Sequence, residues 1–147
     1  MVKINKKVEY ALIVLKHMMT KEEGELTQAR EICDLYQTPF DTTAKVMQLM
    51  NNRGYFHSQK GAKGGYSLAI KLKDVNYLQL VELIEGKSAT MDCTENKCSL
   101  LSSCNIISPI NKLNKHLWYF FKGLSLDELL NQNSFDPVDK IFEVTGV

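Results

Sequence analysis

The chain has 147 residues, of which 44% are hydrophobic and 24% charged, and its formal net charge is +1. This length suits one domain with a single core, and the composition excludes a mainly disordered or collagen-like chain. No segment has the roughly 18 uninterrupted apolar residues of a membrane span, and the N-terminal segment lacks a secretory leader pattern, so we expect a cytoplasmic protein.

Positive charge is concentrated in one half of the chain. Residues 1–75 hold 12 Lys and Arg against 8 Asp and Glu, a net of +4, whereas residues 76–147 hold 6 against 9, a net of −3. Between Thr42 and Lys73 there is no carboxylate, and the basic residues of this stretch are Lys45, Arg53, Lys60, Lys63, Lys71 and Lys73. Such a stretch favours contact with a polyanion, although solvated lysines on an ordinary surface give the same pattern.

Three helices are predicted before residue 54. Apolar residues at helical spacing indicate the first, over residues 5–20. The second is expected to begin behind Thr27 as its N-cap, and the third to follow Thr38 and Pro39, where proline suits the first helical turn. Two short helices joined by a brief turn are the outline of a helix-turn-helix.

A β-hairpin is predicted to follow. The segments Tyr55–Ser58 and Tyr66–Ala69 have strand character and flank the glycine-rich basic segment Gln59–Gly65, as in the wing of a winged helix. Its glycines let the backbone approach a phosphodiester, and Lys60 and Lys63 supply neutralising charge. A phosphate-binding nucleotide loop is the alternative, but the segment lacks a Gly-Lys-Ser/Thr ending and a strand-to-helix context.

The second half of the chain begins with a predicted helix over residues 75–86, followed by a polar segment. Apolar residues then return at helical spacing, at Ile110, Leu113, Leu117, Phe120 and Leu124. The run from Trp118 to Phe121 makes this helix apolar on more than one side, so we expect it to pack against a second copy of the chain. Ser125 and Glu128 form the capping-box pattern of a final short helix.

Three cysteines, Cys93, Cys98 and Cys104, fall within 12 residues. On one continuous helix their thiols would not face a common site, whereas the polar residues between them favour a loop organised by a bound inorganic centre. Gaps of four and five residues without a fourth cysteine nearby match structural zinc poorly and suit an iron-sulfur cluster with one other ligand. Buried or oxidisable thiols are the alternative. Cys33 is expected to be a small core residue of the second helix.

Several of these segments together resemble a known family. The segment Gly64–Ala69, the preceding Arg53–Tyr55, and a Lys-x-x-Glu-Tyr-Ala pattern in the first helix resemble the Rrf2 family of bacterial winged-helix regulators over about residues 1–130. With the cysteine triplet, the chain is most similar to the iron-sulfur branch that includes IscR, NsrR and RirA. The resemblance implies a cluster held by the three cysteines, with four irons favoured over two, in a homodimer. It also implies that the cluster, sensing redox, nitric oxide or iron-sulfur status, sets promoter affinity.

Departures from the family pattern concern the fourth ligand and the recognition helix. The first cysteine gap is one residue shorter than usual, and Ile107 stands where IscR-like members have a histidine ligand. Glu9 matches the carboxylate that NsrR-like members supply from the partner subunit, which implies a fourth ligand here; a solvated helix charge is the alternative. His116 is expected to be a surface or interface residue. Thr42 and Thr43 replace a common Tyr-Leu pair.

The expected fold class is mainly α with a small β wing. We assign residues 1–86 to a winged helix-turn-helix DNA-binding domain, 87–107 to a cysteine-bearing cluster loop, 108–130 to a dimerisation helix with a short terminal helix, and 131–147 to a C-terminal tail. The predicted DNA-contacting residues are Thr38, Asp41, Thr42, Lys45, Lys60 and Lys63.

We therefore predict a homodimeric regulator of double-stranded promoter DNA, with no membrane and no small-molecule substrate. The main alternative is a cluster-free regulator of the same fold that uses cysteine oxidation or a partner protein as its signal. A small metal enzyme is disfavoured, because no convergent general base or substrate-pocket motif is present.

Overall fold

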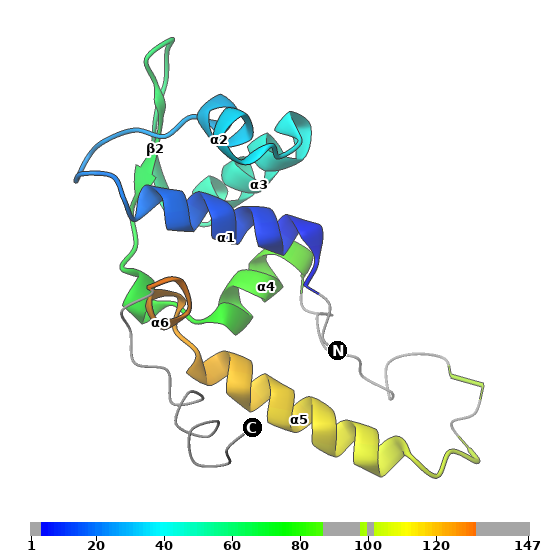
Figure 1. Cartoon of the computed structure of the whole chain (residues 1–147). Helices are drawn as coiled ribbons and strands as arrows, with labels where there is room; N and C mark the ends of the chain where they lie inside the picture. The colour runs from blue at the N-terminus through cyan, green and yellow to red at the C-terminus, as the bar shows by residue number, and fades with distance from the viewer. Residues whose placement is uncertain (1–3, 87–97, 100–101, 132–147) are drawn as a thin grey trace, which may run out of the picture.

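The computed structural model describes residues 4–86, 98–99 and 102–131. Its elements are α1 (Lys6–Met18), α2 (Ala29–Tyr36), α3 (Phe40–Asn52), β1 (Phe56–Gln59), β2 (Gly65–Leu68), the 3-10 turn η1 (Leu72–Asp74), α4 (Tyr77–Glu85), α5 (Ile107–Gly123) and α6 (Leu126–Leu130). The fold is mainly α with one two-stranded antiparallel sheet, which confirms the expected class (Figure 1). Cys93, most of the predicted cluster loop and nearly all of the predicted tail lie outside the described residues.

Helix α1 lies at the centre of the core. The side chain of Asn5 accepts a hydrogen bond from the backbone N–H of Lys7 at 2.9 Å and so caps the first turn. The buried face of the helix consists of Val8, Ala11, Val14, Leu15, His17 and Met18. The helix ends two residues before the predicted Thr20, whose hydroxyl donates to the carbonyl of His17 at 2.7 Å.

The start of α2 corrects the prediction for Thr27. The N-cap is Gln28, and Thr27 instead forms an isolated antiparallel bridge with Tyr66 of the hairpin. Two backbone hydrogen bonds of 2.8 and 2.9 Å join Thr27 and Tyr66. Thr27 is fully buried, because the segment before α2 adds a third extended piece to the edge of the sheet.

Helices α2 and α3 form the predicted helix-turn-helix. Gln37 adopts a left-handed conformation (φ 56°) in the turn, and Pro39 is the N-cap of α3, one position before the predicted first turn. The buried face of α3, formed by Thr43, Val46, Met47 and Met50, packs against α1 and α2. This packing leaves the opposite face of α3 in solvent.

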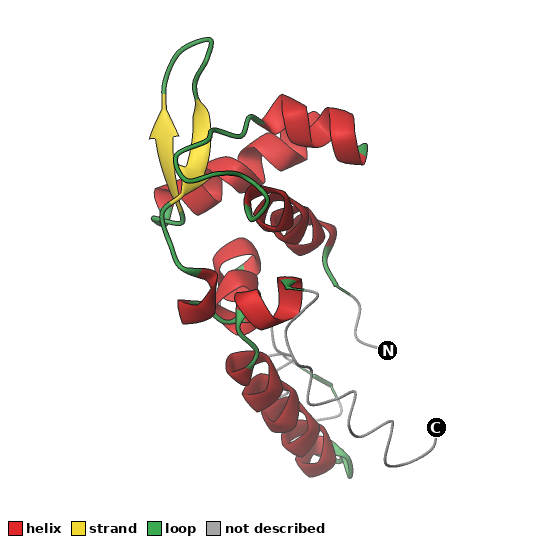
Figure 2. Ribbon diagram, turned by 60° about the vertical axis from the view of Figure 1, so that its left-hand side comes forward, coloured by secondary structure: helices red, strands yellow, loops and turns green. Residues whose placement is uncertain are grey.

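The hairpin has the predicted position, with strands displaced by about one residue. Phe56 pairs with Leu68 and Gln59 with Gly65. Gly64 is required in the loop, because a Cβ there would lie 2.1 Å from the backbone oxygen of Gln59. In Figures 1 and 2 the hairpin extends from the end of the molecule that holds α2 and α3.

The last three helices are joined through a short backbone pairing. Asn76 and Ser125 each head a capping box, and the segments that contain them form an antiparallel bridge. Tyr77 N–H donates to the carbonyl of Leu124, and Leu126 N–H donates to that of Val75, both at 2.8 Å. This pairing fixes the C-terminal end of α5 against the start of α4.

Helix α5 lies at the opposite end of the molecule from the hairpin in both views (Figures 1 and 2). It packs on α4, where the rings of Tyr77 and Phe121 lie 5.0 Å apart between centroids. No residue of α5 is fully buried. Across the described residues, no helix is both long and apolar enough to cross a bilayer.

Candidate functional site

The solvent-facing side of α3 carries a row of polar side chains. Asp41, Lys45, Gln48 and Asn52 are exposed, and their spacing of three and four residues places them on one face of the helix. The sequence reasoning missed Gln48, although its position three residues after Lys45 was the signal that could have revealed it. Amide, carboxylate and ammonium groups along one exposed helix face are the groups that read base edges in a major groove.

Two predicted contact residues lie away from the centre of this face. Thr38 is only 8% exposed, and its hydroxyl accepts from the Thr43 hydroxyl at 2.9 Å and contacts the sulfur of Cys33 at 3.6 Å. Thr38 therefore joins α2 to α3 inside the helix-turn-helix. Thr42 is half-buried at the edge of the face. Of the α3 residues predicted to contact DNA, Asp41 and Lys45 are exposed on the same face of the helix.

The wing loop presents the other two predicted contacts. Lys60 and Lys63 are exposed, on either side of the tip glycine Gly61. Gln28, at the start of α2, donates from its side-chain amide to the carbonyl oxygens of Ala62 at 3.3 Å and Gly64 at 2.7 Å. The loop is thus held to the helix-turn-helix by a side chain that the sequence reasoning did not single out.

The basic stretch remains electrostatically available. All six of its basic residues are exposed, and the ion pairs found among the described residues involve other groups. Exposed cations that form no ion pair attract a polyanion at long range. Lys45 lies on α3 and Lys60 and Lys63 in the wing loop, so these three form the part of the predicted footprint at the end that holds α3 and the wing. Lys71 and Lys73 lie at η1, which contacts α6.

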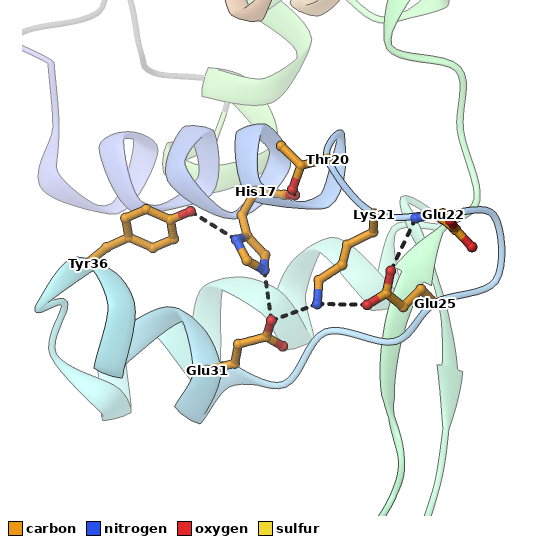
Figure 3. Close-up of polar contacts among 7 residues, drawn as sticks. All are labelled: His17, Thr20, Lys21, Glu22, Glu25, Glu31 and Tyr36. Atoms are coloured by element: carbon orange, nitrogen blue, oxygen red, sulfur yellow. Dashed lines mark hydrogen bonds and ion pairs between the residues drawn. The ribbon is translucent and has the colours of Figure 1, made fainter.

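A polar network joins α1 to α2 behind this surface (Figure 3). His17 is buried; its Nδ1 lies 2.9 Å from the Tyr36 hydroxyl and its Nε2 lies 3.0 Å from Glu31 Oε1. Lys21 Nζ donates to Glu31 at 2.7 Å and to Glu25 at 3.2 Å. Burial by itself raises the pKa of Glu31, but the hydrogen bonds from Lys21 and His17 outweigh it and hold that pKa below its ordinary value. The network fixes the orientation of α2.

The described cysteines occupy two separate places. Cys98 is exposed and Cys104 half-buried, both as free thiols in the segment that leads into α5. Thiolates with this accessibility are suitable donors for an iron-sulfur cluster. Cys33 is half-buried on α2, so its assignment to the core was only partly right. Within the described ranges, no three His, Cys, Asp or Glu side chains are grouped as a metal site.

Glu9 lies on the first turn of α1, and its side chain is 44% exposed. It forms an ion pair of 2.9 Å with Lys6, and this hydrogen bond raises the pKa of Lys6. Glu9 therefore does not complete a three-ligand group with Cys98 and Cys104 inside one chain, at least among the residues that the structure describes. His116 is exposed on α5.

Comparison with protein families gives one match that spans most of the chain. The model of the Rrf2 family, described as iron-dependent transcriptional regulators, matches residues 4–132. An HTH-type transcriptional regulator of Aquifex aeolicus is 30% identical over 128 residues, covering 84% of this chain and 88% of the relative. The HTH-type transcriptional regulator NsrR of Oceanobacillus iheyensis is 28% identical over 133 residues, covering 86% and 88%. These relatives are regulators, which agrees with the prediction that the chain is not an enzyme.

Comparison with solved structures supports the same architecture. The oxidised form of CymR from Staphylococcus aureus superposes with a TM-score of 0.70 at 18% identity, covering 91% of this chain and all of that one. IscR of T. potens superposes with a TM-score of 0.64 at 19% identity, covering 88% and 86%. At these identities the likeness concerns the fold.

Proposed function

The chain belongs to the Rrf2 family of transcriptional regulators, and on this premise we propose that it binds promoter DNA as a homodimer whose affinity is set by an iron-sulfur cluster. The cluster ligands in this proposal are Cys93, Cys98 and Cys104. The signal is redox state, nitric oxide or iron-sulfur status. The observation that carries the proposal is that Cys98 and Cys104 precede α5 in the chain, the helix that carries an exposed apolar face.

DNA recognition follows from the two exposed features at one end of the molecule. The polar face of α3 enters the major groove, with Asp41, Lys45 and Gln48 toward base edges. Lys60 and Lys63 of the wing contact the neighbouring phosphates. In this arrangement the wing supplies salt-dependent affinity, whereas α3 supplies the choice of sequence.

Dimerisation uses the apolar stripe of α5. Leu113 and Phe120 are each 53% exposed, and Ile106, just before the helix, is 54% exposed. Ile110 and Leu117 lie on the same side of the helix by spacing and are half-buried. A stripe of this length on one helix is typical of an interface that a second copy covers. A twofold dimer then presents two copies of α3 to two half-sites.

The donor set fits an iron-sulfur cluster. Cys98 and Cys104 are accessible free thiols, and soft thiolates are the protein ligands that such clusters take. When bound, the cluster supplies iron that reacts with oxygen, nitric oxide or competing thiols. Glu9 is partly exposed on the first turn of α1 and forms no three-ligand group with the described cysteines of its own chain, so in this proposal it acts as the fourth ligand for the cluster of a partner subunit. Cys104 precedes α5 by three residues. In this proposal, cluster binding at Cys104 changes the position of α5 in the dimer.

A cluster-free regulator is the second candidate. The exposed thiol of Cys98 favours it, because an accessible thiol is open to oxidation. The signal would then be the oxidation state of the cysteines themselves, or a partner protein that contacts them. Iron and sulfide analysis of protein purified without oxygen separates this candidate from the first.

The deciding experiment compares two cysteine variants. After anaerobic reconstitution, we expect the wild-type protein to be coloured and to contain iron and sulfide, and Cys98→Ala to lose the visible absorbance because a ligand is missing. Cys33→Ala is the matched control and keeps the colour, since Cys33 lies on α2. A colourless wild-type protein that still retards promoter DNA would establish the cluster-free candidate. Full colour in Cys98→Ala would remove this residue from the ligand set.

A further inference from the structure

One large apolar side chain at the end of the molecule that holds α3 and the wing lies outside the apolar core of the described residues. Phe40 is the first residue of α3 and is 48% exposed. It belongs neither to the buried core nor to the half-buried apolar residues packed against that core. About half of this apolar residue is exposed, and that surface gains free energy when a partner covers it.

The ring is held from one side by a cation. The guanidinium carbon of Arg30, in the first turn of α2, lies 5.5 Å from the centroid of the Phe40 ring. A guanidinium over an aromatic face is attracted by the ring's electron density. Arg30 therefore covers one face of the ring, and as an exposed cation outside the ion pairs of the described residues it is available to a phosphate.

The position of Phe40 decides what it can contact. The first residues of the second helix of a helix-turn-helix are those that come closest to base edges. Asp41 and Lys45, the next exposed residues of α3, begin the polar face beside it. Among the groups on the major-groove edges of the bases, the C5 methyl group of thymine is the apolar one, and phenylalanine is a side chain that contacts it.

We propose that Phe40 is a specificity-determining residue that packs against a thymine methyl group, while Arg30 steadies the ring and contacts the adjacent backbone phosphate. This inference rests on the proposed DNA-binding function and adds a base preference to it. The apolar contact selects thymine over cytosine at one position of each half-site, since cytosine lacks the methyl group. Removing that methyl group lowers affinity by about 3- to 5-fold per contact.

The experiment uses the full-length protein, prepared anaerobically, and a duplex that the wild-type protein selects from random sequence. Each thymine is replaced in turn by deoxyuridine, which removes only the methyl group, and affinity is measured by fluorescence anisotropy. We expect one symmetric pair of positions at which the wild-type protein loses about 3- to 5-fold per half-site. Phe40→Ala is expected to bind the thymine and deoxyuridine duplexes equally.

Two further variants define the result. Leu35→Ala removes another exposed apolar side chain, on α2, and is expected to keep the wild-type sensitivity to deoxyuridine. Phe40→Leu is expected to keep part of it, because leucine preserves an apolar surface. Insensitivity of the wild-type protein to deoxyuridine at every thymine overturns the inference, as does undiminished sensitivity in Phe40→Ala. If the protein selects no duplex in any preparation, the proposed DNA-binding function itself fails.

Discussion

At the scale of single residues, His17 shows how a polar group is accommodated in an apolar core. It is buried on α1, and both of its ring nitrogens have partners on α2, Tyr36 and Glu31. A buried imidazole without partners destabilises a fold, whereas one with both nitrogens bonded fixes the relative position of two helices. The helix-turn-helix is therefore anchored to α1 by directional contacts as well as by apolar packing.

Replacement of Glu31 by glutamine tests this anchor. The folded-state pKa of Glu31 lies below its ordinary value of 4.5, so the ionised carboxylate stabilises the fold above that pH, and the contribution is lost as the pH falls through the folded-state pKa. We expect Glu31→Gln to lower the free energy of unfolding by about 1 kcal/mol near neutral pH. The difference from wild type should shrink as the pH falls from about 5 to about 3.

Urea unfolding at several pH values measures this difference. Glu82→Gln on α4 is the control, because Glu82 is exposed and makes no ion pair among the described residues. A Glu31→Gln difference that stays constant with pH would show that its carboxylate does not stabilise the fold through its charge.

At the scale of elements, the wing depends on a contact made by another element. Its loop contains glycines at positions 61 and 64, which allow the tight turn, and Gln28 of the α2 N-cap bonds to two carbonyl groups of that loop. A loop with several glycines has high conformational entropy in the absence of such contacts. Gln28 is therefore a positioning residue for the wing lysines.

A double-mutant cycle tests this dependence. Lys60→Ala with Lys63→Ala is expected to lower the salt dependence of DNA binding by about two released ions per subunit. Gln28→Ala is expected to weaken binding by about 5-fold in the wild-type background, since the loop loses two hydrogen bonds, and to have little further effect when both lysines are absent.

The readout of this cycle is the slope of log affinity against log salt for each variant. Charge-conserving replacement of both lysines by arginine is the control and should keep the wild-type slope. An equal loss from Gln28→Ala in both backgrounds would mean that Gln28 affects binding through something other than the wing.

At the scale of the whole molecule, the proposed DNA-binding surface and the proposed dimer helix are separate. The wing and α3 lie at one end, and α5 lies at the other (Figures 1 and 2). Among the described elements, helix α5 packs mainly against α4. The apolar stripe is exposed among the described residues and is a surface for association. Twofold association through α5 would place two copies of α3 in one dimer.

The variant Phe120→Glu places a charge in this stripe. We expect the dimer dissociation constant to rise on the order of 100-fold, because an unpaired carboxylate would be buried at the interface. Tyr119→Glu is the matched control: Tyr119 is 58% exposed but is turned by about 100° around the helix from Phe120. Analytical ultracentrifugation distinguishes the two. A Phe120→Glu protein that sediments as a wild-type dimer would place the interface elsewhere.

Local patterns in the sequence were sufficient to predict most of the helices and the hairpin. The helix-turn-helix, the hairpin, both ends of α6 and the exposed lysines follow from periodicity, turn residues and capping residues that lie within a few positions of one another. The charge split and the cysteine spacing are likewise properties of the linear chain. The family resemblance also depends on local segments, Arg53–Tyr55, Gly64–Ala69 and the Lys-x-x-Glu-Tyr-Ala pattern, together with the cysteine triplet.

Contacts between distant positions were decided by the tertiary structure. The local sequence predicts Thr27 as an N-cap, but its backbone pairs with Tyr66. Thr38 was predicted to contact DNA, but it is buried and contacts Thr43 and Cys33. Gln28 acts on a loop more than 30 positions away. The physical reason is that hydrogen-bond partners and burial depend on which elements pack together. The free energy of that packing is summed over the whole core. Sequence periodicity indicates only which face of a single element is apolar.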